Sequence, residues 1–374
     1  MKKILIITLE FPPQVGGIAT YVQDFAAALP PDNIVVLAPK STQPDNYPFK
    51  VIRKKLLARF WWPRWLKLTW HVLRIIKKEN IEIILLHHVL PVGYAALIAC
   101  WIKKIPFIIF SHGTDIAAAS RRPWKRLMVK MVCRSAEQIV MNSESLKRRF
   151  LIKFGQFRTK IAVVYPCPNK IFSEPVPATQ INDIANRLAI GGRKVILSVA
   201  RMVDGKGFPH MVRVIKEVAD QVPNITWLII GTGPKLAEII DLVQKNSLQN
   251  IVRFVGEIPH SDLPNYFQAS TLFALLTHPD NGQEEGLGLV FLEAAASGLP
   301  CIAGKSGGVE EAVVNGQTGF VFDVYQNQKS ISEGIVSLLT NESLAKRLGQ
   351  AGKERILAEF NWKNQLSGLD QWLN

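Results

Sequence analysis

The chain has 374 residues, of which 48% are hydrophobic and 20% charged, and its mean hydropathy is +0.12. This composition excludes a disordered or fibrous protein, and the length allows two domains that each bury a core. The formal net charge of +15 is uneven, because residues 1–180 hold 28 Lys and Arg against 10 Asp and Glu, whereas the remainder holds 17 against 20. We therefore expect an anionic partner for the first half.

The apolar segments predict neither a secretion signal nor a membrane span. The opening MKKILIITLEFPP is interrupted by Glu10 and is interpreted as a first strand. The longest apolar stretch, residues 89–102, contains Pro and Gly and is too short to cross a bilayer. The four cysteines have no metal-ligand or redox spacing, so we expect reduced core residues in a cytoplasmic protein.

Short runs rich in Val and Ile alternate with amphipathic stretches along the chain. In the first half they read KKILIIT, NIVVLA, IEIILLHH, PFIIFSHG, QIVMNS and KIAVVYP, and in the second KVILSVA, TWLIIGTG, VRFVGE, LFALLT and LPCIAG. This alternation predicts an α/β protein with two doubly wound, parallel-sheet domains whose ligand edges face a cleft. Residues 172–192 contain prolines, paired glycines and no clear strand, and they are interpreted as a linker between domains at 1–172 and 193–357.

A basic and aromatic stretch occupies residues 53–78, with nine Lys and Arg, five Trp and Phe, and no acid. Spacings of three and four predict a helix with a cationic face that includes His71 and Arg74. Its apolar face, Leu66, Trp70 and Leu73 continued by Val72 and Ile76, would pack against the sheet. The aromatic residues exceed what a sheet-covering helix needs, and residues 121–130 repeat the combination. We expect both clusters to contact an anionic membrane surface. The predicted contacts are Phe60, Trp61, Trp62, Arg64, Lys67, Arg121, Arg122, Trp124, Lys125 and Arg126.

Residues suited to phosphate and sugar follow the strands of the second half. Arg201 and Lys206 lie in one turn after KVILSVA, where both could reach a diphosphate, although exposed loop cations are the simpler interpretation. Gly231 and Gly233 follow TWLII and would let the backbone approach a ligand, or simply make a tight turn.

The segment EEGLGLVFLEAAASG is the most informative one. A helix beginning near Gly288 and Leu289 would place Glu293 more than a turn inside it and leave Glu285 on the preceding loop. The first amides of such a helix form a phosphate seat, and carboxylates accept hydrogen bonds from sugar hydroxyls.

Taken in order, these segments resemble the family-4 retaining glycosyltransferases, which have the two-domain GT-B fold. The resemblance covers essentially the whole chain through LEFPPQVGGIATYV, SHGTDI, SVARMVDGKG, IIGTGP, RFVGEIPHSDLPNYFQAS, EEGLGLVFLEAAASGLPCIAG and SGGVEEAVVNGQTGFVF. The glutamate segment looks particularly like that of the phosphatidylinositol mannosyltransferases. The family usually carries an N-G-V-D run where this chain has YPCPNK, so that Asn169 stands near the family's Asp.

The resemblance implies roles for individual residues. Arg201 and Lys206 would neutralise the donor's diphosphate, Glu285 would orient the transferred sugar, Glu293 would bind the ribose, and His112 would position the sugar. The implied donor contacts are Gly16, Gly17, Gly231, Gly233, Val255, Gly256, Gly286, Leu287, Gly288, Leu289, Val290 and Glu293. The paired His87 and His88 are interpreted as strand-end residues and not as metal ligands.

The resemblance also implies the reaction. We expect transfer of a hexose with retention, without metal or another cofactor, from GDP-mannose to a lipid or lipid-linked glycan on the inner face of the cell membrane. The helix at about 358–374 would cross back onto the first domain. A UDP-glucose or UDP-N-acetylglucosamine transferase of cell-surface polysaccharide synthesis is the alternative enzyme. A basic nucleic-acid or membrane-surface binding protein is the non-enzyme alternative, but the Glu285 and Glu293 pair disfavours nucleic acid. No obligate protein partner is evident.

Overall fold

The computed structural model describes residues 1–14, 16–58, 62–113, 122–326 and 328–373, and it divides into two compact units. The first unit is Met1–Cys167 with Trp362–Asn374, and the second is Pro168–Asn361. The chain therefore enters the second unit earlier than the predicted residue 172, because Phe172 is buried there against the rings of His260 and Phe267. The predicted linker is part of the second unit and contains a helix, α7 (Ala178–Arg187).

The first unit is a parallel seven-stranded sheet with the order β3-β2-β1-β4-β5-β6-β7. Its strands are β1 (Ile4–Ile7), β2 (Ile34–Pro39), β3 (Lys50–Lys54), β4 (Ile83–Leu86), β5 (Phe107–Ser111), β6 (Gln138–Met141) and β7 (Lys160–Val163). Its helices are α1 (Gly17–Ala27), α2 (Leu66–Glu79), α3 (Val92–Lys103), α5 (Pro123–Ser135), α6 (Glu144–Phe154), α15 (Trp362–Leu366) and α16 (Asp370–Leu373), with short 3-10 turns η1 (Pro31–Asn33) and η4 (Ser367–Leu369). The order along the sheet reverses between β1 and β4, which places a ligand-binding switch point there.

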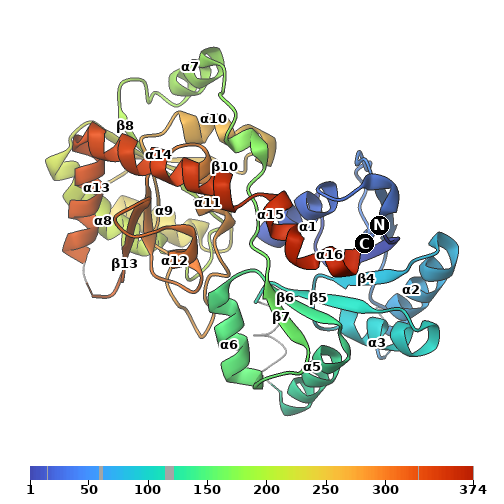
Figure 1. The fold of residues 1–374 in the computed structure, drawn as a ribbon. Coiled ribbons are helices and arrows are strands. Elements are labelled where there is room, and N and C mark those ends of the chain that lie inside the picture. Colours follow the sequence, from blue (N-terminus) through green and yellow to red (C-terminus); the bar gives the residue numbers. More distant parts are fainter. Residues whose placement is uncertain (15, 59–61, 114–121, 327, 374) are drawn as a thin grey trace. The chain divides into compact units, whose positions relative to one another are not determined.

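Two cores lie on opposite faces of this sheet. Side chains from α2, α3, α5 and α6 pack on one face, including Leu68 and Val132, whereas Phe25 of α1 and Leu369 and Leu373 of the C-terminal segment pack on the other. Figure 1 shows these two helix layers on either side of β4 and β5. The end of the chain thus returns to the first unit, but as short pieces from Trp362 onward and not as one helix over 358–374.

The predicted faces of α2 are confirmed only in part, because Val72 and Ile76 are buried as expected and Leu73 packs against the same core. His71, expected on the cationic face, is buried, whereas Leu66 and Trp70 are 43% and 55% exposed. The buried face also includes Leu68 and Ile75, which were not predicted, so it is rotated away from Leu66 and Trp70. Because of this rotation Trp70 faces outward beside Arg74, whose guanidinium lies 5.3 Å from the Trp70 ring centroid.

The second unit is a parallel six-stranded sheet with the order β10-β9-β8-β11-β12-β13, which reverses between β8 and β11. Its strands are β8 (Lys194–Val199), β9 (Ile225–Ile230), β10 (Val252–Gly256), β11 (Leu272–Leu275), β12 (Cys301–Gly304) and β13 (Gly319–Phe322). Besides α7, its helices are α8 (Phe208–Gln221), α9 (Leu236–Lys245), α10 (Leu263–Gln268), α11 (Leu289–Ala296), α12 (Val309–Ala312), α13 (Gln328–Thr340) and α14 (Glu342–Glu359), with 3-10 turns η2 (Lys170–Phe172) and η3 (His260–Asp262).

A buried polar chain ties the middle of this sheet together. The fully buried Trp227 of β9 donates its indole N–H to Ser198 Oγ of β8 at 2.9 Å, and Ser198 Oγ donates to the carbonyl of Ala274 in β11 at 2.5 Å. The strands on both sides of the reversal are thereby held in register, so the loops that leave β8 and β11 start from fixed positions. In the part of the chain that the structure describes, no helix is both long and apolar enough to cross a membrane.

Candidate functional site

The loops that carry the predicted sugar and phosphate ligands leave the two strands at the reversal of the second sheet. Arg201 and Lys206 follow β8, and Glu285 lies on the long loop after β11. The carboxyl ends of parallel strands lie at one edge, and ligands of doubly wound sheets bind at the reversal. The fold therefore brings together residues that are about 80 positions apart in the sequence.

Lys206 and Glu285 contact each other directly. The ammonium Nζ of Lys206 lies 2.5 Å from Glu285 Oε2, and both side chains are partly buried. A charge-assisted bond of this kind orients both groups. The predicted cation for the diphosphate and the predicted carboxylate for the sugar therefore form one charged cluster.

The backbone of Glu285 is held by the segment after β12, which sequence reasoning did not identify as part of the site. The Glu285 N–H donates to Ser306 Oγ at 3.1 Å, and the Gly308 N–H donates to the Glu285 carbonyl at 3.2 Å. A Cβ at Gly307 would lie 1.9 Å from that carbonyl oxygen, so this close approach requires glycine. The Ser-Gly-Gly run at 306–308 was the only sequence signal for this support.

The predicted helix after Glu285 is confirmed as α11. Gly288 precedes it with φ of 87°, in the left-handed region, and a Cβ there would lie 2.6 Å from the Phe291 ring. Gly288 has no side chain that could cap the helix, and the Phe291 N–H donates to the Gly288 carbonyl at 2.9 Å, so the amides of Leu289 and Val290 are the candidates for a phosphate. The side chain of Leu287 is buried, which leaves only its backbone for the predicted donor contact.

Glu293 lies in the middle of α11 and is 5% exposed. Its Oε1 is 2.8 Å from Nε2 of His260, the first residue of η3. His260 lies in the segment RFVGEIPHSDLPNYFQAS, which carries part of the family resemblance, but the sequence did not predict this contact. Nearby, Asn169 accepts a hydrogen bond from the Ile171 N–H at 3.2 Å and caps η2, a local structural role at the position where the family usually has Asp.

The glycines after β9 are explained by contacts between loops. A Cβ at Gly231 would lie 2.1 Å from the Ala200 carbonyl oxygen, and one at Gly233 would lie 2.4 Å from that of Met202. The Gly231 N–H donates to the carbonyl of Gly256, at the end of β10 beside Val255. These glycines therefore let the loops after β8, β9 and β10 pack closely, whether or not they also contact a donor.

In the first unit, the loop after β1 carries Gly16 and Gly17, and here no such packing explains the glycines. Among the described residues, a Cβ at Gly17 would meet nothing within 4 Å, and one at Gly16 would meet only Glu10 Oε2, at 3.9 Å. No described side chain therefore fills the space beside these two glycines.

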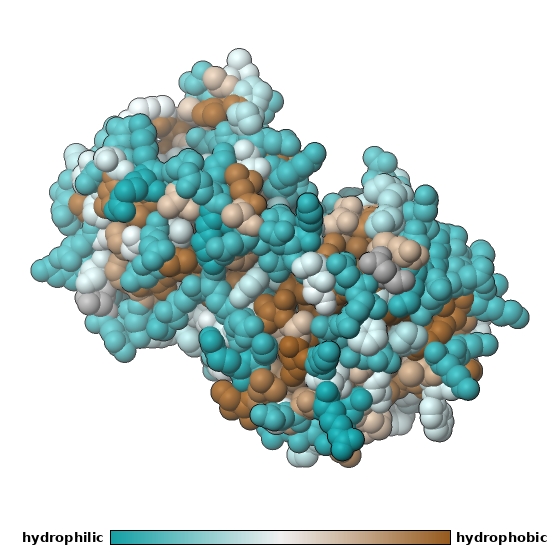
Figure 2. Space-filling model, in the orientation of Figure 1, coloured by the Kyte–Doolittle hydropathy of each residue, from teal (hydrophilic) through white to brown (hydrophobic). Residues whose placement is uncertain are grey.

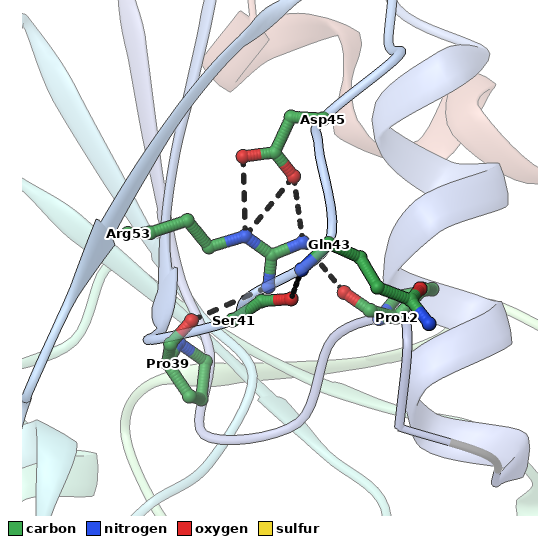
Figure 3. Close-up of polar contacts among 6 residues, drawn as sticks. All are labelled: Pro12, Pro39, Ser41, Gln43, Asp45 and Arg53. Atoms are coloured by element: carbon green, nitrogen blue, oxygen red, sulfur yellow. Dashed lines mark hydrogen bonds and ion pairs between the residues drawn. The ribbon is translucent and has the colours of Figure 1, made fainter.

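Arg53 anchors the start of the same loop. Its guanidinium pairs with Asp45 at 2.7 Å and donates to the carbonyls of Pro12 and Pro39 at 2.5 and 3.3 Å, as Figure 3 shows. Its side chain is only 13% exposed. The first cation of the basic stretch therefore has a structural role, and it ties the β1 loop to β2 and β3.

His112 directly follows β5 and pairs with a second buried histidine. His112 Nε2 is 3.3 Å from Nδ1 of His87, which directly follows β4. The His87 ring stacks on Phe110 with centroids 4.7 Å apart, and Tyr21 meets the His112 ring edge-on at 5.0 Å. Both rings are buried, and burial, with the neighbouring His88, lowers the pKa of His112 to about 3.

The same environment acts on the other members of this aromatic cluster. Burial, reinforced by His112 and His88, lowers the pKa of His87 well below its ordinary value, and burial raises that of Tyr21. The two histidines are therefore neutral at physiological pH, and one ring donates a hydrogen bond to the other. His87 is thus a strand-end residue as predicted, but it is also the partner of His112.

The predicted membrane contacts that the structure describes are exposed, apart from Lys125, which is half-buried. Phe60, Trp61 and Arg121 lie outside the described residues. Trp62 is 88% exposed, Trp124 is 53% exposed with Lys125 5.8 Å from its ring, and Arg64, Lys67, Arg122 and Arg126 are exposed.

Two further exposed side chains escaped the sequence analysis, namely Trp101 at 90% and Ile102 at 57%, at the end of α3 beside Lys103 and Lys104. Figure 2 shows hydrophobic side chains reaching the surface over α5 and α6 in this unit. Among the described residues, no group of three or more His, Cys, Asp or Glu could hold a metal ion.

Comparison with known proteins agrees with this architecture. The model of the family "Glycosyltransferase Family 4" matches residues 15–169, and that of "Glycosyl transferases group 1" matches residues 180–355. A GDP-mannose-dependent monoacylated alpha-(1-6)-phosphatidylinositol monomannoside mannosyltransferase of Corynebacterium glutamicum is 30% identical over 97% of this chain and 95% of its own length. A GDP-mannose-dependent alpha-(1-6)-phosphatidylinositol monomannoside mannosyltransferase of Mycobacterium tuberculosis is 26% identical over 100% of this chain and 98% of its own length.

Solved structures show the same fold. Anabaena Alr3699/HepE in complex with UDP and glucose superposes with a TM-score of 0.82 at 18% identity, covering 100% of this chain and 99% of the other. Sucrose-phosphate synthase from Thermosynechococcus elongatus gives 0.82 at 22% identity, covering 99% and 98%. The fold is thus that of the GT-B enzymes, with two Rossmann-like domains. The chain belongs to the family-4 glycosyltransferases and is a glycosyltransferase.

Proposed function

We propose that this glycosyltransferase moves mannose from GDP-mannose onto a lipid or lipid-linked glycan acceptor at a membrane surface. The observation that carries the proposal is the Lys206–Glu285 cluster at the reversal of the second sheet, next to the open first turn of α11. The choice of donor and acceptor is supported by the two relatives that the comparisons name as GDP-mannose-dependent mannosyltransferases of a phosphatidylinositol glycolipid.

The charges of the cluster support a route for the leaving group. Arg201, Lys206 and the first amides of α11 would stabilise the negative charge that develops on the departing diphosphate, a preorganised electrostatic contribution to catalysis. Two cations in this role would make a divalent metal unnecessary. Chelation with EDTA should accordingly leave the transfer rate unchanged, and a loss that Mg²⁺ or Mn²⁺ restores would overturn this part of the proposal.

The pairing of Glu285 bears on how the configuration is retained. A carboxylate whose oxygen is engaged by Lys206 at 2.5 Å is poorly suited to attack an anomeric carbon and well suited to accept sugar hydroxyls. We assign Glu285 to sugar orientation, with the donor phosphate taking the proton of the acceptor. Trapping of a glycosyl–enzyme bond on Glu285 with a slow donor analogue would refute this assignment.

A layer of three helices supports the membrane part of the proposal. α2, α3 and α5 each present an exposed tryptophan, respectively Trp70, Trp101 and Trp124, beside cations on the same helix. A hollow between α2 and α3 is lined by Trp70, Leu73, Arg74, Lys77, Lys78 and Lys103. Indoles next to Lys and Arg suit the interface of an anionic bilayer.

Two assays test the proposal. In the first, protein is incubated with radiolabelled GDP-mannose, UDP-glucose or UDP-N-acetylglucosamine and a membrane lipid extract, and label is counted in the organic phase. We expect label from GDP-mannose, whereas label from only a UDP-sugar would refute the donor and water-soluble product alone would refute the acceptor. In the second, vesicles containing phosphatidylglycerol should sediment the protein more than phosphatidylcholine vesicles do.

The matched variants for vesicle binding are chosen by exposure. Trp101→Ala combined with Trp124→Ala should weaken binding to anionic vesicles by about tenfold, because each exposed indole contributes interfacial area. Tyr325→Ala, which removes a 66% exposed aromatic ring in the second unit, is the control and should bind like the wild type. Equal binding by all three proteins would show that the helix layer is not the membrane face.

A further inference from the structure

His260 and Glu293 make a contact between two elements that are 33 residues apart. Nε2 of His260 lies 2.8 Å from Glu293 Oε1, and the Glu293 side chain is only 6% exposed. An ionised carboxylate only accepts hydrogen bonds, so the proton of this bond belongs to His260 Nε2. One carboxylate oxygen is therefore occupied and the plane of the carboxylate is constrained.

The His260 ring is itself held in place. The ring of Phe172 meets it edge-on, with centroids 5.1 Å apart, and Phe172 is fully buried, with a perpendicular contact to Phe267 at 5.5 Å. Phe172 closes η2, the turn that Asn169 caps. The segment that opens the second unit therefore supports His260 from behind, and His260 in turn supports Glu293.

We infer that His260 is the positioning residue that aims the Glu293 carboxylate at the ribose hydroxyls of the bound nucleotide. The inference rests on the proposed function, in which Glu293 binds the ribose. A carboxylate that is free to rotate must be reoriented each time a nucleotide binds. A carboxylate fixed by a charge-assisted hydrogen bond is already oriented to accept hydrogen bonds from the two ribose hydroxyls. A purely structural role, in which His260 only satisfies a buried acid, predicts a different experimental result.

The test compares nucleotides that differ only at the ribose. Dissociation constants are measured by calorimetry for GDP, UDP and ADP, and then for the 2′,3′-dideoxy form of the nucleoside diphosphate that binds most tightly. The proteins are the wild type, His260→Ala, His260→Gln and the neighbouring control Ser261→Ala. The Ser261 hydroxyl donates to Asp262 on the same turn at 2.9 Å, so this control perturbs η3 without removing the contact with Glu293.

The wild type and Ser261→Ala should bind the ribonucleotide at least tenfold more tightly than its dideoxy form, since a hydrogen bond to a charged group contributes on this scale. In His260→Ala the ribonucleotide should lose about tenfold in affinity and the dideoxy form no more than about twofold, so that discrimination at the ribose collapses. His260→Gln, whose amide N–H can donate to the same carboxylate, should recover part of the discrimination between the two nucleotides. Phe172→Leu should reduce discrimination in the same direction by a smaller factor.

Two other results would overturn the inference, and they separate it from the proposed function. In the first, the wild type binds the ribonucleotide more tightly than its dideoxy form, and His260→Ala weakens the binding of both equally or of neither. His260 would then have only a structural role, and the proposed function would stand. If the wild type binds none of the three nucleoside diphosphates, or binds the dideoxy form as well as the ribonucleotide, the role of Glu293 itself is refuted.

Discussion

Two glycines that we assign to donor contact should respond in opposite ways to the same substitution. Gly17 is the first residue of α1, and a Cβ there meets no described residue within 4 Å. Alanine at a compatible position stabilises a protein by about 0.4–1 kcal/mol, because it restricts the unfolded chain. Gly17→Ala should therefore raise the unfolding temperature of the first unit by about 1–4 °C. If the donor occupies the open space beside this loop, the same methyl group should lower kcat/KM by about tenfold or more.

Gly233→Ala supplies the contrast in the second unit. Its Cβ would lie 2.4 Å from the Met202 carbonyl oxygen, well inside van der Waals contact, so the loops after β8 and β9 must separate. Overpacking of this kind costs about 1–3 kcal/mol, and here it also displaces the turn that carries Arg201. We expect Gly233→Ala to lose both stability and activity, whereas Gly17→Ala loses activity while gaining stability.

Differential scanning calorimetry and initial rates of transfer from radiolabelled GDP-mannose measure the two quantities on the same preparations. A Gly17→Ala protein with raised stability and an unchanged kcat/KM would refute the idea that a ligand fills the space beside Gly17. A Gly233→Ala protein as stable as the wild type would refute the loop-packing explanation instead.

Three further substitutions test separate parts of the structure. Because burial lowers the pKa of His87, the unfolded chain binds a proton below about pH 6.5 that the folded chain does not bind, and the stability of the fold decreases as the pH falls. His87→Phe should reduce the slope of unfolding free energy against pH, between pH 6.5 and 5, by up to about 1.4 kcal/mol per pH unit. Equal slopes for the wild type and the variant would contradict this. Ser306→Ala, which removes the acceptor of the Glu285 N–H, should lower kcat several-fold in transfer assays. Its free energy of unfolding in urea should change by less than about 1 kcal/mol. An unaltered kcat would show that the Ser306 hydroxyl is not needed to hold Glu285. Arg53→Met should cost about 2 kcal/mol in urea unfolding because it leaves partly buried acceptors unpaired. Lys346→Met, which breaks the exposed pair with Glu342, should cost less than about 1 kcal/mol, and equal losses would show that Arg53 is an ordinary surface cation.

Much of the fold could be predicted from the sequence because its determinants are local. Runs such as ILII in β1 are apolar over their whole length, as strands covered on both faces must be, and all four residues are buried. The position of Glu293 inside a helix followed from the glycines before it and the apolar run around it, and α11 begins at Leu289 as expected. The order of loops along the chain was likewise sufficient to predict which residues reach the carboxyl edge of each sheet.

The choice between two similar helix faces required the tertiary structure. In α2, two apolar faces of helical spacing are possible, one with Leu66 and Trp70 and one with Leu68 and Ile75, and the prediction assigned Val72 to the first. Only packing against the sheet decides which is buried, and the sheet takes the aliphatic stripe while Trp70 stays outside with its cations. The exposure of Trp101 was not predicted for the same reason, since an apolar run does not reveal which of its side chains stay exposed to solvent.

The supporting contacts of the site also depended on the tertiary structure. The pairs His260 and Glu293, His87 and His112, and Ser306 and Glu285 come from separate helices, turns or loops, between 21 and 33 residues apart. By itself the sequence determined the strands, the helix that carries Glu293 and the loops that carry charge, because these depend on hydrophobic period and on glycine at chain turns. Only the tertiary structure decided which side chains hold the charged groups in place, because that depends on distances between strands that the linear pattern does not contain.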